Sequence, residues 1–66
     1  MSSIGQQVRE ARKAQGLTQD ELAAAAGVHA LTVSYIETGK VQPTSTTLEV
    51  IAQALGVQFT IGDANG

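Results

Sequence analysis

Four segments of the chain repeat apolar residues at helical spacing, and a glycine follows each segment. In the first, Ser3 can cap a helix, and Ile4, Val8 and Ala11 then lie on one face before the stop at Gly16. Glycine suits such stops because it adopts the left-handed backbone conformation that closes a helix. The pattern therefore predicts a bundle of short helices.

The second and third segments form a pair joined by a short turn. Thr18 and Glu21 have the spacing of a capping box, in which each side chain bonds the backbone amide of the other residue. A helix should therefore begin directly after Thr18. A third helix should run from about His29 to Glu37, and Gly27 lies between the two helices where the chain must turn.

The fourth segment follows Pro43, which cannot continue a preceding helix, while Thr44 can cap a new one. Its apolar residues recur at positions i, i+3, i+4 and i+7 before the next glycine, as one face of a helix requires. They are Leu48, Ile51, Ala52 and Leu55.

After Gly56 the period of the pattern changes. Val57, Phe59 and Ile61 alternate with polar residues, which places them on one face of an extended strand. Because the chain holds no second strand to pair with it, we expect this strand to pair with its copy in a homodimer. The alternatives are a fifth short helix and a coil docked on the helices.

These patterns predict an all-α fold, a compact bundle of four to five short helices, with a short C-terminal β-strand. We expect a helical domain over residues 1–56, a dimerisation strand over residues 57–61 and a flexible tail over residues 62–66. A domain of 66 residues buries only a small core, so oligomerisation is the expected stabiliser.

Composition narrows the functional classes. Without cysteine the chain has no disulfide, and a single histidine cannot build a zinc centre, so we expect no metal and no cofactor. It holds no paired nucleophile and base and no phosphate-cradling loop, which argues against an enzyme. No stretch approaches the roughly 20 apolar residues of a membrane span, and a signal peptide pattern is missing, so we expect a cytoplasmic protein.

Charge leaves a nucleic-acid partner open. The net charge of −2 argues mildly against indiscriminate binding to polyanions. Arg9, Arg12 and Lys13 nevertheless cluster in the first segment, and Lys40 lies in a later loop. A local basic surface is therefore compatible with the sequence.

Two stretches resemble the phage-repressor family of helix-turn-helix proteins, the Cro-like and Xre-like regulators: VREARKAQGLTQDELAAAAGVHALTVSYIETGK and PTSTTLEVIAQALG. The resemblance covers about residues 4 to 56 and implies a lambda-repressor-like DNA-binding domain. In this fold the second helix of the pair lies in the major groove while the first crosses the backbone. The resemblance further implies a homodimeric transcriptional regulator, a repressor, that binds double-stranded DNA at a palindromic operator.

By this resemblance, the base-reading positions are His29, Ala30, Leu31, Ser34 and Tyr35. Since the side chains of Ala30 and Leu31 offer no hydrogen bonds, readout would rest on contacts with thymine methyls, on the three polar residues and on DNA shape. The alternative for His29 is an ordinary helix-start residue, and for Tyr35 a ring packed against the neighbouring helix.

The resemblance also implies phosphate contacts from the start of the second helix and from the loop after the third. The residues concerned are Thr18, Gln19, Lys40, Gln42 and Thr44. Lys40 supplies a cation for backbone neutralisation, and the helix N-terminus adds its positive end at Gln19. The alternatives are a solvated glutamine and a solvated loop.

Two further roles follow from the resemblance. Arg12 and Glu37 occupy positions that form a buried or half-buried ion pair between the first and third helices, a structural role, whereas Arg9 and Lys13 can be solvated surface charges. An extended strand behind such a domain is also similar to antitoxins whose toxin is a protein kinase. The alternative function is therefore an antitoxin that neutralises a toxin protein and regulates its own promoter.

Overall fold

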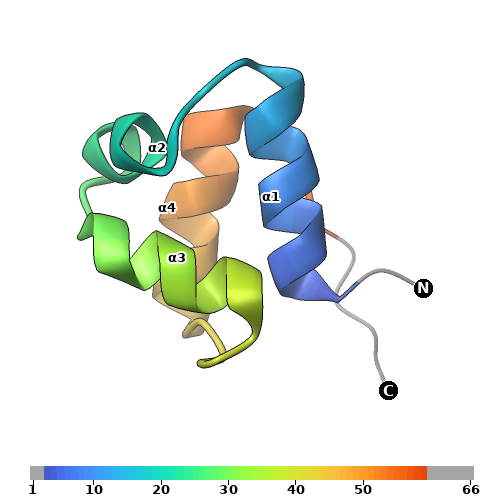
Figure 1. Cartoon of the computed structure of the whole chain (residues 1–66), viewed down its shortest axis with the longest axis vertical. Coiled ribbons are helices and arrows are strands. Elements are labelled where there is room, and N and C mark those ends of the chain that lie inside the picture. The colour runs from blue at the N-terminus through green and yellow to red at the C-terminus, as the bar shows by residue number, and fades with distance from the viewer. Residues whose placement is uncertain (1–2, 60–66) are drawn as a thin grey trace.

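The computed structural model describes residues 3–59 and contains four α-helices within them (Figure 1). Helix α3 packs against α1 and α2, and α4 packs against α2 and α1. No β-strand occurs within residues 3–59. The predicted all-helical bundle is confirmed, with these bounds: α1 Ile4–Ala14, α2 Gln19–Ala26, α3 Ala30–Thr38 and α4 Ser45–Leu55.

Local side-chain caps and glycine stops define these helices. The hydroxyl oxygens of Ser3, Thr18 and Thr44 accept backbone amide hydrogen bonds at the starts of α1, α2 and α4. At α2 the capping box is complete, because the Glu21 carboxylate also accepts the Thr18 amide at 2.8 Å. The four glycines that follow the helices all have φ between +68° and +80°.

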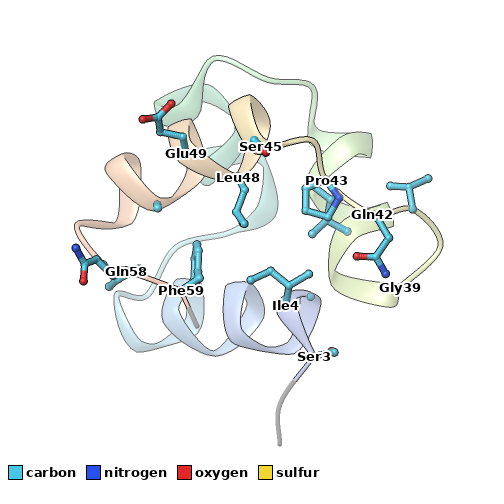
Figure 2. A pocket seen from close by; sticks show the side chains of 15 residues that line it. Ser3, Ile4, Gly39, Gln42, Pro43, Ser45, Leu48, Glu49, Gln58 and Phe59 are labelled. Carbon is cyan, nitrogen blue, oxygen red and sulfur yellow. The ribbon is translucent and has the colours of Figure 1, made fainter. Parts of the chain in front are cut away.

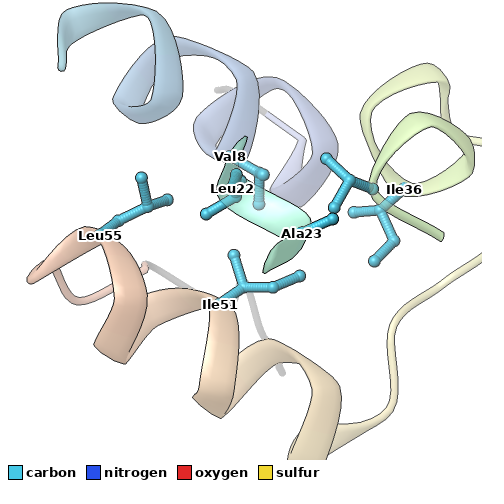
Figure 3. Packing of buried hydrophobic residues seen from close by; sticks show 7 residues of the cluster. Val8, Leu22, Ala23, Ile36, Ile51 and Leu55 are labelled. Atoms are coloured by element: carbon cyan, nitrogen blue, oxygen red, sulfur yellow. The ribbon is translucent and has the colours of Figure 1, made fainter. Parts of the chain in front are cut away.

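The core is formed where the four apolar stripes meet (Figure 3). Every helix contributes at least one side chain that is almost fully removed from water, which is the main source of stability in so small a domain. The buried hydrophobic residues are Val8, Leu22, Ala23, Val33, Ile36, Ile51 and Leu55.

Gly5 allows α1 to approach α3 closely. A Cβ atom built on Gly5 would collide with the carbonyl oxygen of Ile36, and it would lie 3.2 Å from the carbonyl oxygen of Glu37. Any larger residue at position 5 must therefore push the two helices apart. This close contact fixes how the end of α3 sits on α1.

The predicted C-terminal strand is not supported in its described part. Residues 57–59 adopt no regular secondary structure, and Val57 and Phe59 pack against the helical core of their own chain. These side chains therefore find apolar contacts in their own chain, without a second copy of the strand. Residues 57–59 thus form a coil docked on the helices, which was one of the two alternatives to a strand. Ile61 and the predicted tail over residues 62–66 lie outside the described residues.

Residues 57–59 line a cavity together with α1, α3 and α4, and we call it the C-terminal groove. It has a volume of about 1010 Å³, and Ile4 of α1, Leu48 of α4 and Phe59 line it from three sides (Figure 2). Pro43 and Gln42, from the loop before α4, also line it.

Candidate nucleic-acid interface

A tight turn sets α3 across α2. Gly27 closes α2 with φ +74°, in the left-handed region that a side chain rarely adopts, and only three residues separate the two helices. The amide of Val28 donates to the carbonyl of Ala23 at 3.0 Å, which satisfies the end of α2. Ala23 itself is buried, so its small side chain permits close packing of the pair. Two short helices joined in this way form a helix-turn-helix.

One face of α3 remains exposed. Leu31 is 59% exposed and Tyr35 38% exposed, and with Thr38 they occupy positions i, i+4 and i+7 of the helix. Val33 and Ile36 point to the opposite side, into the core. The hydrophobic anchor thus fixes which side chains α3 presents outward. Two further predicted base-reading residues, Ala30 and Ser34, are half-buried.

His29 precedes α3 as its N-cap residue, but its side chain makes no capping hydrogen bond. The first helical bonds are accepted instead by its backbone carbonyl, from the amides of Thr32 and Val33 at 3.0 and 3.3 Å. The exposed imidazole therefore lies at the start of α3 without a local structural role as a cap.

Lys40 lies beside the exposed face of α3. Its ammonium nitrogen is 5.6 Å from the centre of the Tyr35 ring, within the range of a cation–π interaction. The Tyr35 ring is thus covered by this lysine. Such contacts at exposed sites contribute only about 0.5–1 kcal/mol, so the ammonium group can turn from the ring to a phosphate at little cost.

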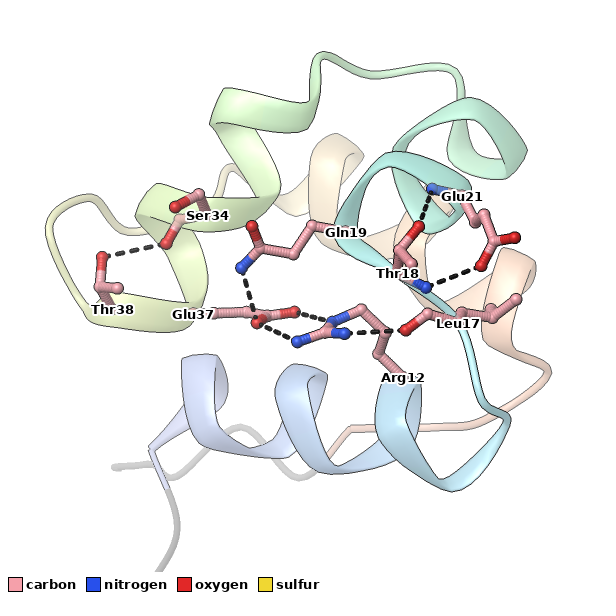
Figure 4. A network of polar contacts seen from close by, with 8 residues as sticks. All are labelled: Arg12, Leu17, Thr18, Gln19, Glu21, Ser34, Glu37 and Thr38. Atoms are coloured by element: carbon pink, nitrogen blue, oxygen red, sulfur yellow. Dashed lines mark hydrogen bonds and ion pairs between the residues drawn. The ribbon is translucent and has the colours of Figure 1, made fainter.

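A buried polar network ties α1, α2 and α3 together (Figure 4). The Arg12 guanidinium donates to both carboxylate oxygens of Glu37, from Nε at 2.7 Å and from Nη2 at 3.0 Å. Its Nη1 donates to the carbonyl of Leu17 at 2.8 Å, and Gln19 Nε2 donates to Glu37 Oε1 at 3.1 Å. The two charged side chains are only 10% and 2% exposed. Arg12 and Glu37, which the resemblance pairs, are therefore in direct contact.

The network changes the protonation behaviour of both charged groups. Burial alone would raise the pKa of Glu37, but the hydrogen bonds from Arg12 and Gln19 and the charges of Arg12 and Arg9 outweigh it. The pKa of Glu37 is therefore lowered from its ordinary value. The hydrogen bond to Glu37 raises the pKa of Arg12, so the pair stays ionised at neutral pH.

Gln19 has a contact that sequence reasoning missed. It was expected to reach DNA, yet its carboxamide holds Glu37, near the end of α3, from the start of α2. The only sequence signal was a long polar side chain at the first position of a helix, and this does not reveal a partner 18 residues away. One N–H of the amide is used in this bond, and the second is still suited to a phosphate.

The other predicted phosphate contacts are distributed over three places. Thr18 and Thr44 cap α2 and α4, and the hydroxyl of Thr44 also donates to that of Thr47 at 2.9 Å. Gln42 is exposed and lines the C-terminal groove (Figure 2). Of the predicted loop residues, Lys40 is thus the one whose contact with α3 is evident.

Within residues 3–59, no group of three His, Asp or Glu side chains gathers that could hold a metal ion. No helix in that part of the chain is long and apolar enough to cross a membrane.

Comparisons with known proteins point to one family. The sequence matches the helix-turn-helix family over residues 8–61. It is 42% identical over 60 residues to the uncharacterized HTH-type transcriptional regulator RghRB of Bacillus subtilis (strain 168), covering 89% of this chain and 43% of the relative. It is 38% identical over 58 residues to the immunity repressor protein of Bacillus phage phi105, covering 88% of this chain and 40% of the relative.

A solved structure shares the fold. A mutant of the restriction-modification controller protein C.Esp1396I superposes with a TM-score of 0.79 at 27% sequence identity, covering 83% of this chain and 71% of that one. The chain spans less than half the length of the two curated relatives, 43% and 40%. The similarity therefore concerns the helix-turn-helix part of those proteins.

Proposed function

The chain belongs to the Xre-like family of helix-turn-helix proteins, and from that membership we propose that it binds double-stranded DNA sequence-specifically as a transcriptional regulator, acting as a repressor. The observation that carries the proposal is the exposed face of α3, with Leu31 and Tyr35 directed outward and Lys40 beside them. A helix presented in this way fits the major groove, which is about 12 Å wide.

The charges around α3 support this proposal despite the net charge of −2. The single carboxylate of α3, Glu37, has a side chain only 2% exposed and is paired with Arg12. The exposed face of the helix therefore presents no carboxylate that would repel phosphates. Lys40 adds a cation, and the N-terminal end of α3, whose first turn holds no acidic residue, adds a positive partial charge.

The proposal includes a homodimer on a palindromic operator. A domain of 66 residues has a small core, and association is a common way to stabilise it. Two copies related by a twofold axis would place their α3 helices in major-groove half-sites roughly 34 Å apart. Sedimentation equilibrium of the chain without DNA should give about twice the monomer mass of 6.8 kDa. If the chain shows the monomer mass even at high protein concentration, the proposed dimer is contradicted, but the proposed DNA binding is not.

The antitoxin alternative gains no support. It depended on a C-terminal strand that residues 57–59 do not form, and the relatives reported above are named as regulators or as a repressor. We therefore propose no toxin partner.

Selection from a random duplex library tests the proposed function. The chain should enrich a palindrome, and its affinity for that duplex should fall steeply with salt, because each neutralised phosphate releases a counterion. Lys40→Ala should weaken binding to all duplexes alike and reduce the salt slope by about 1. Tyr35→Ala should instead change the enriched sequence.

A second lysine variant separates the effect of a direct phosphate contact from the effect of the net charge of the chain. Lys13 is an exposed cation near the end of α1, and Lys13→Ala removes the same charge as Lys40→Ala. We expect a smaller loss of affinity for Lys13→Ala. Failure to enrich any duplex at low salt would overturn the proposed function, and equal losses for the two lysines would remove Lys40 from the interface.

A further inference from the structure

The exposed face of α3 is apolar near its N-terminal end. Leu31 is the most exposed of the large hydrophobic residues described, at 59%, and the half-buried Ala30, which also packs against the core, precedes it. A single exposed leucine is common on protein surfaces, so exposure alone carries no function. Leu31, however, lies on the face of α3 that would contact the base edges in the proposed interface.

Two polar residues further along this face, Tyr35 and Thr38, have partners within the chain. The hydroxyl of Thr38 donates to the carbonyls of Ser34 and Tyr35 in its own helix, at 2.9 and 3.3 Å. Lys40 covers the ring of Tyr35. Leu31 itself offers a base edge van der Waals contact alone, because its side chain has no donor or acceptor.

Base edges in the major groove display one apolar group, the methyl on C5 of thymine. In 5-methylcytosine the same ring position carries the same methyl. Thymine and 5-methylcytosine otherwise differ at position 4, in an oxygen acceptor or an amino donor, which only hydrogen-bonding side chains can distinguish. Leu31 and Ala30 have no such atoms.

Resting on the proposed function, we propose that Leu31, with Ala30, reads C5-methyl groups, so that the chain recognises thymine and 5-methylcytosine alike at one operator position. Cytosine methylation at that position would then control the affinity of the chain for its site. Double-stranded DNA is the occupant that the charges favour, because the exposed face of α3 has no carboxylate and Lys40 lies beside it.

The test uses the full chain and the duplex enriched from the random library. Each thymine is replaced in turn by deoxyuracil, which removes only the methyl. At the position facing Leu31 the affinity should fall about fourfold, the factor for one buried methyl group. A pair of duplexes with cytosine or 5-methylcytosine at that position should show a gain of about fourfold on methylation.

Two variants connect the effect to one side chain. Leu31→Ala should bind the duplexes with and without the methyl equally, since the contact atoms are gone; its exposed position allows the fold to persist. Val41→Ala truncates another exposed apolar residue, 44% exposed and outside α3, and should keep the fourfold ratio.

The outcomes separate this inference from the proposed function. An enriched duplex that tolerates deoxyuracil at every position would overturn methyl reading and leave DNA binding intact. Methyl discrimination that survives in Leu31→Ala would overturn the assignment to this residue. Without any enriched duplex, both the proposed function and this inference would be overturned.

Discussion

Replacing Glu37 with glutamine tests the buried network at almost constant volume. In the native protein Arg12 Nε faces Glu37 Oε2, while Arg12 Nη2 and Gln19 Nε2 face Oε1. The glutamine amide has one oxygen, so it can replace either Oε1 or Oε2 but not both. If the oxygen stays between Nη2 and Gln19, the amide nitrogen opposes Arg12 Nε, donor against donor, and the buried guanidinium loses its counterion.

The magnitude is large for this domain. Removing one partner of a buried ion pair costs about 3–5 kcal/mol. A chain of 66 residues has a total stability of about 3–10 kcal/mol. We therefore expect Glu37→Gln to lower the free energy of unfolding at neutral pH by about 3 kcal/mol, the lower end because the hydrogen bonds from Arg12 Nη2 and Gln19 can persist. This corresponds to a fall in Tm of roughly 12–24 °C.

Urea unfolding followed by far-UV circular dichroism measures this loss, with Glu49→Gln as the matched control. Glu49 is exposed, so its replacement should change stability by no more than about 0.5 kcal/mol. Replacing Arg12 by Met together with Glu37 by Leu should recover much of the loss, because no buried charge is left alone. A loss below about 1 kcal/mol for Glu37→Gln would refute the reasoning.

The pH dependence provides a second readout of the same variant. The pKa of Glu37 is lowered in the folded state, so its stabilisation is present above the unfolded-state pKa and is lost as the pH falls through the folded-state pKa. The stabilities of the native chain and Glu37→Gln should therefore converge in acid. A difference that stays constant across that range would contradict the lowered pKa.

Three further substitutions test the fold. Gly5→Ala should destabilise the chain by about 1–3 kcal/mol in urea unfolding, because a Cβ collides with the Ile36 carbonyl; unchanged stability would refute the close helix contact. Thr18→Ala should cost about 1 kcal/mol in the same assay by removing the α2 cap, and a neutral result would show the capping box to be dispensable. Phe59→Ala should destabilise the chain by about 2 kcal/mol, less than the loss of a fully buried phenylalanine, and an unchanged Tm would contradict the docking of Phe59 on the core.

The helices could be predicted because their signals are local. The capping spacing of Thr18 and Glu21 and the glycine stops act within a few residues, and the apolar stripes repeat at the period of the helix. Gly5 gave no such signal. Its role depends on the approach of the Ile36 carbonyl from a distant segment, which no local pattern reveals.

The C-terminal segment shows the limit of periodicity. Alternation of Val57, Phe59 and Ile61 is compatible with a strand, but it cannot reveal a groove built by other helices. The described residues 57–59 dock on the core instead, because burial in the same chain needs no partner.

For the candidate site, the resemblance gave the positions of Leu31 and Tyr35, and the core anchors of α3 account for their exposure. It could not give the bond from Gln19 to Glu37 or the stacking of Lys40 on Tyr35. The first depends on where two separate helices meet, which no spacing within either helix specifies, and the second on how the chain turns at Gly39 after α3.

The most direct test of DNA binding through α3 is a titration of the ¹⁵N-labelled chain with the enriched duplex, followed by amide chemical shifts. We predict that the largest changes occur on α3 at Leu31, Ser34 and Tyr35 and in the loop at Lys40, with small changes on the α4 side of the C-terminal groove. Large changes at Leu48 and Phe59, with α3 unaffected, would contradict the account.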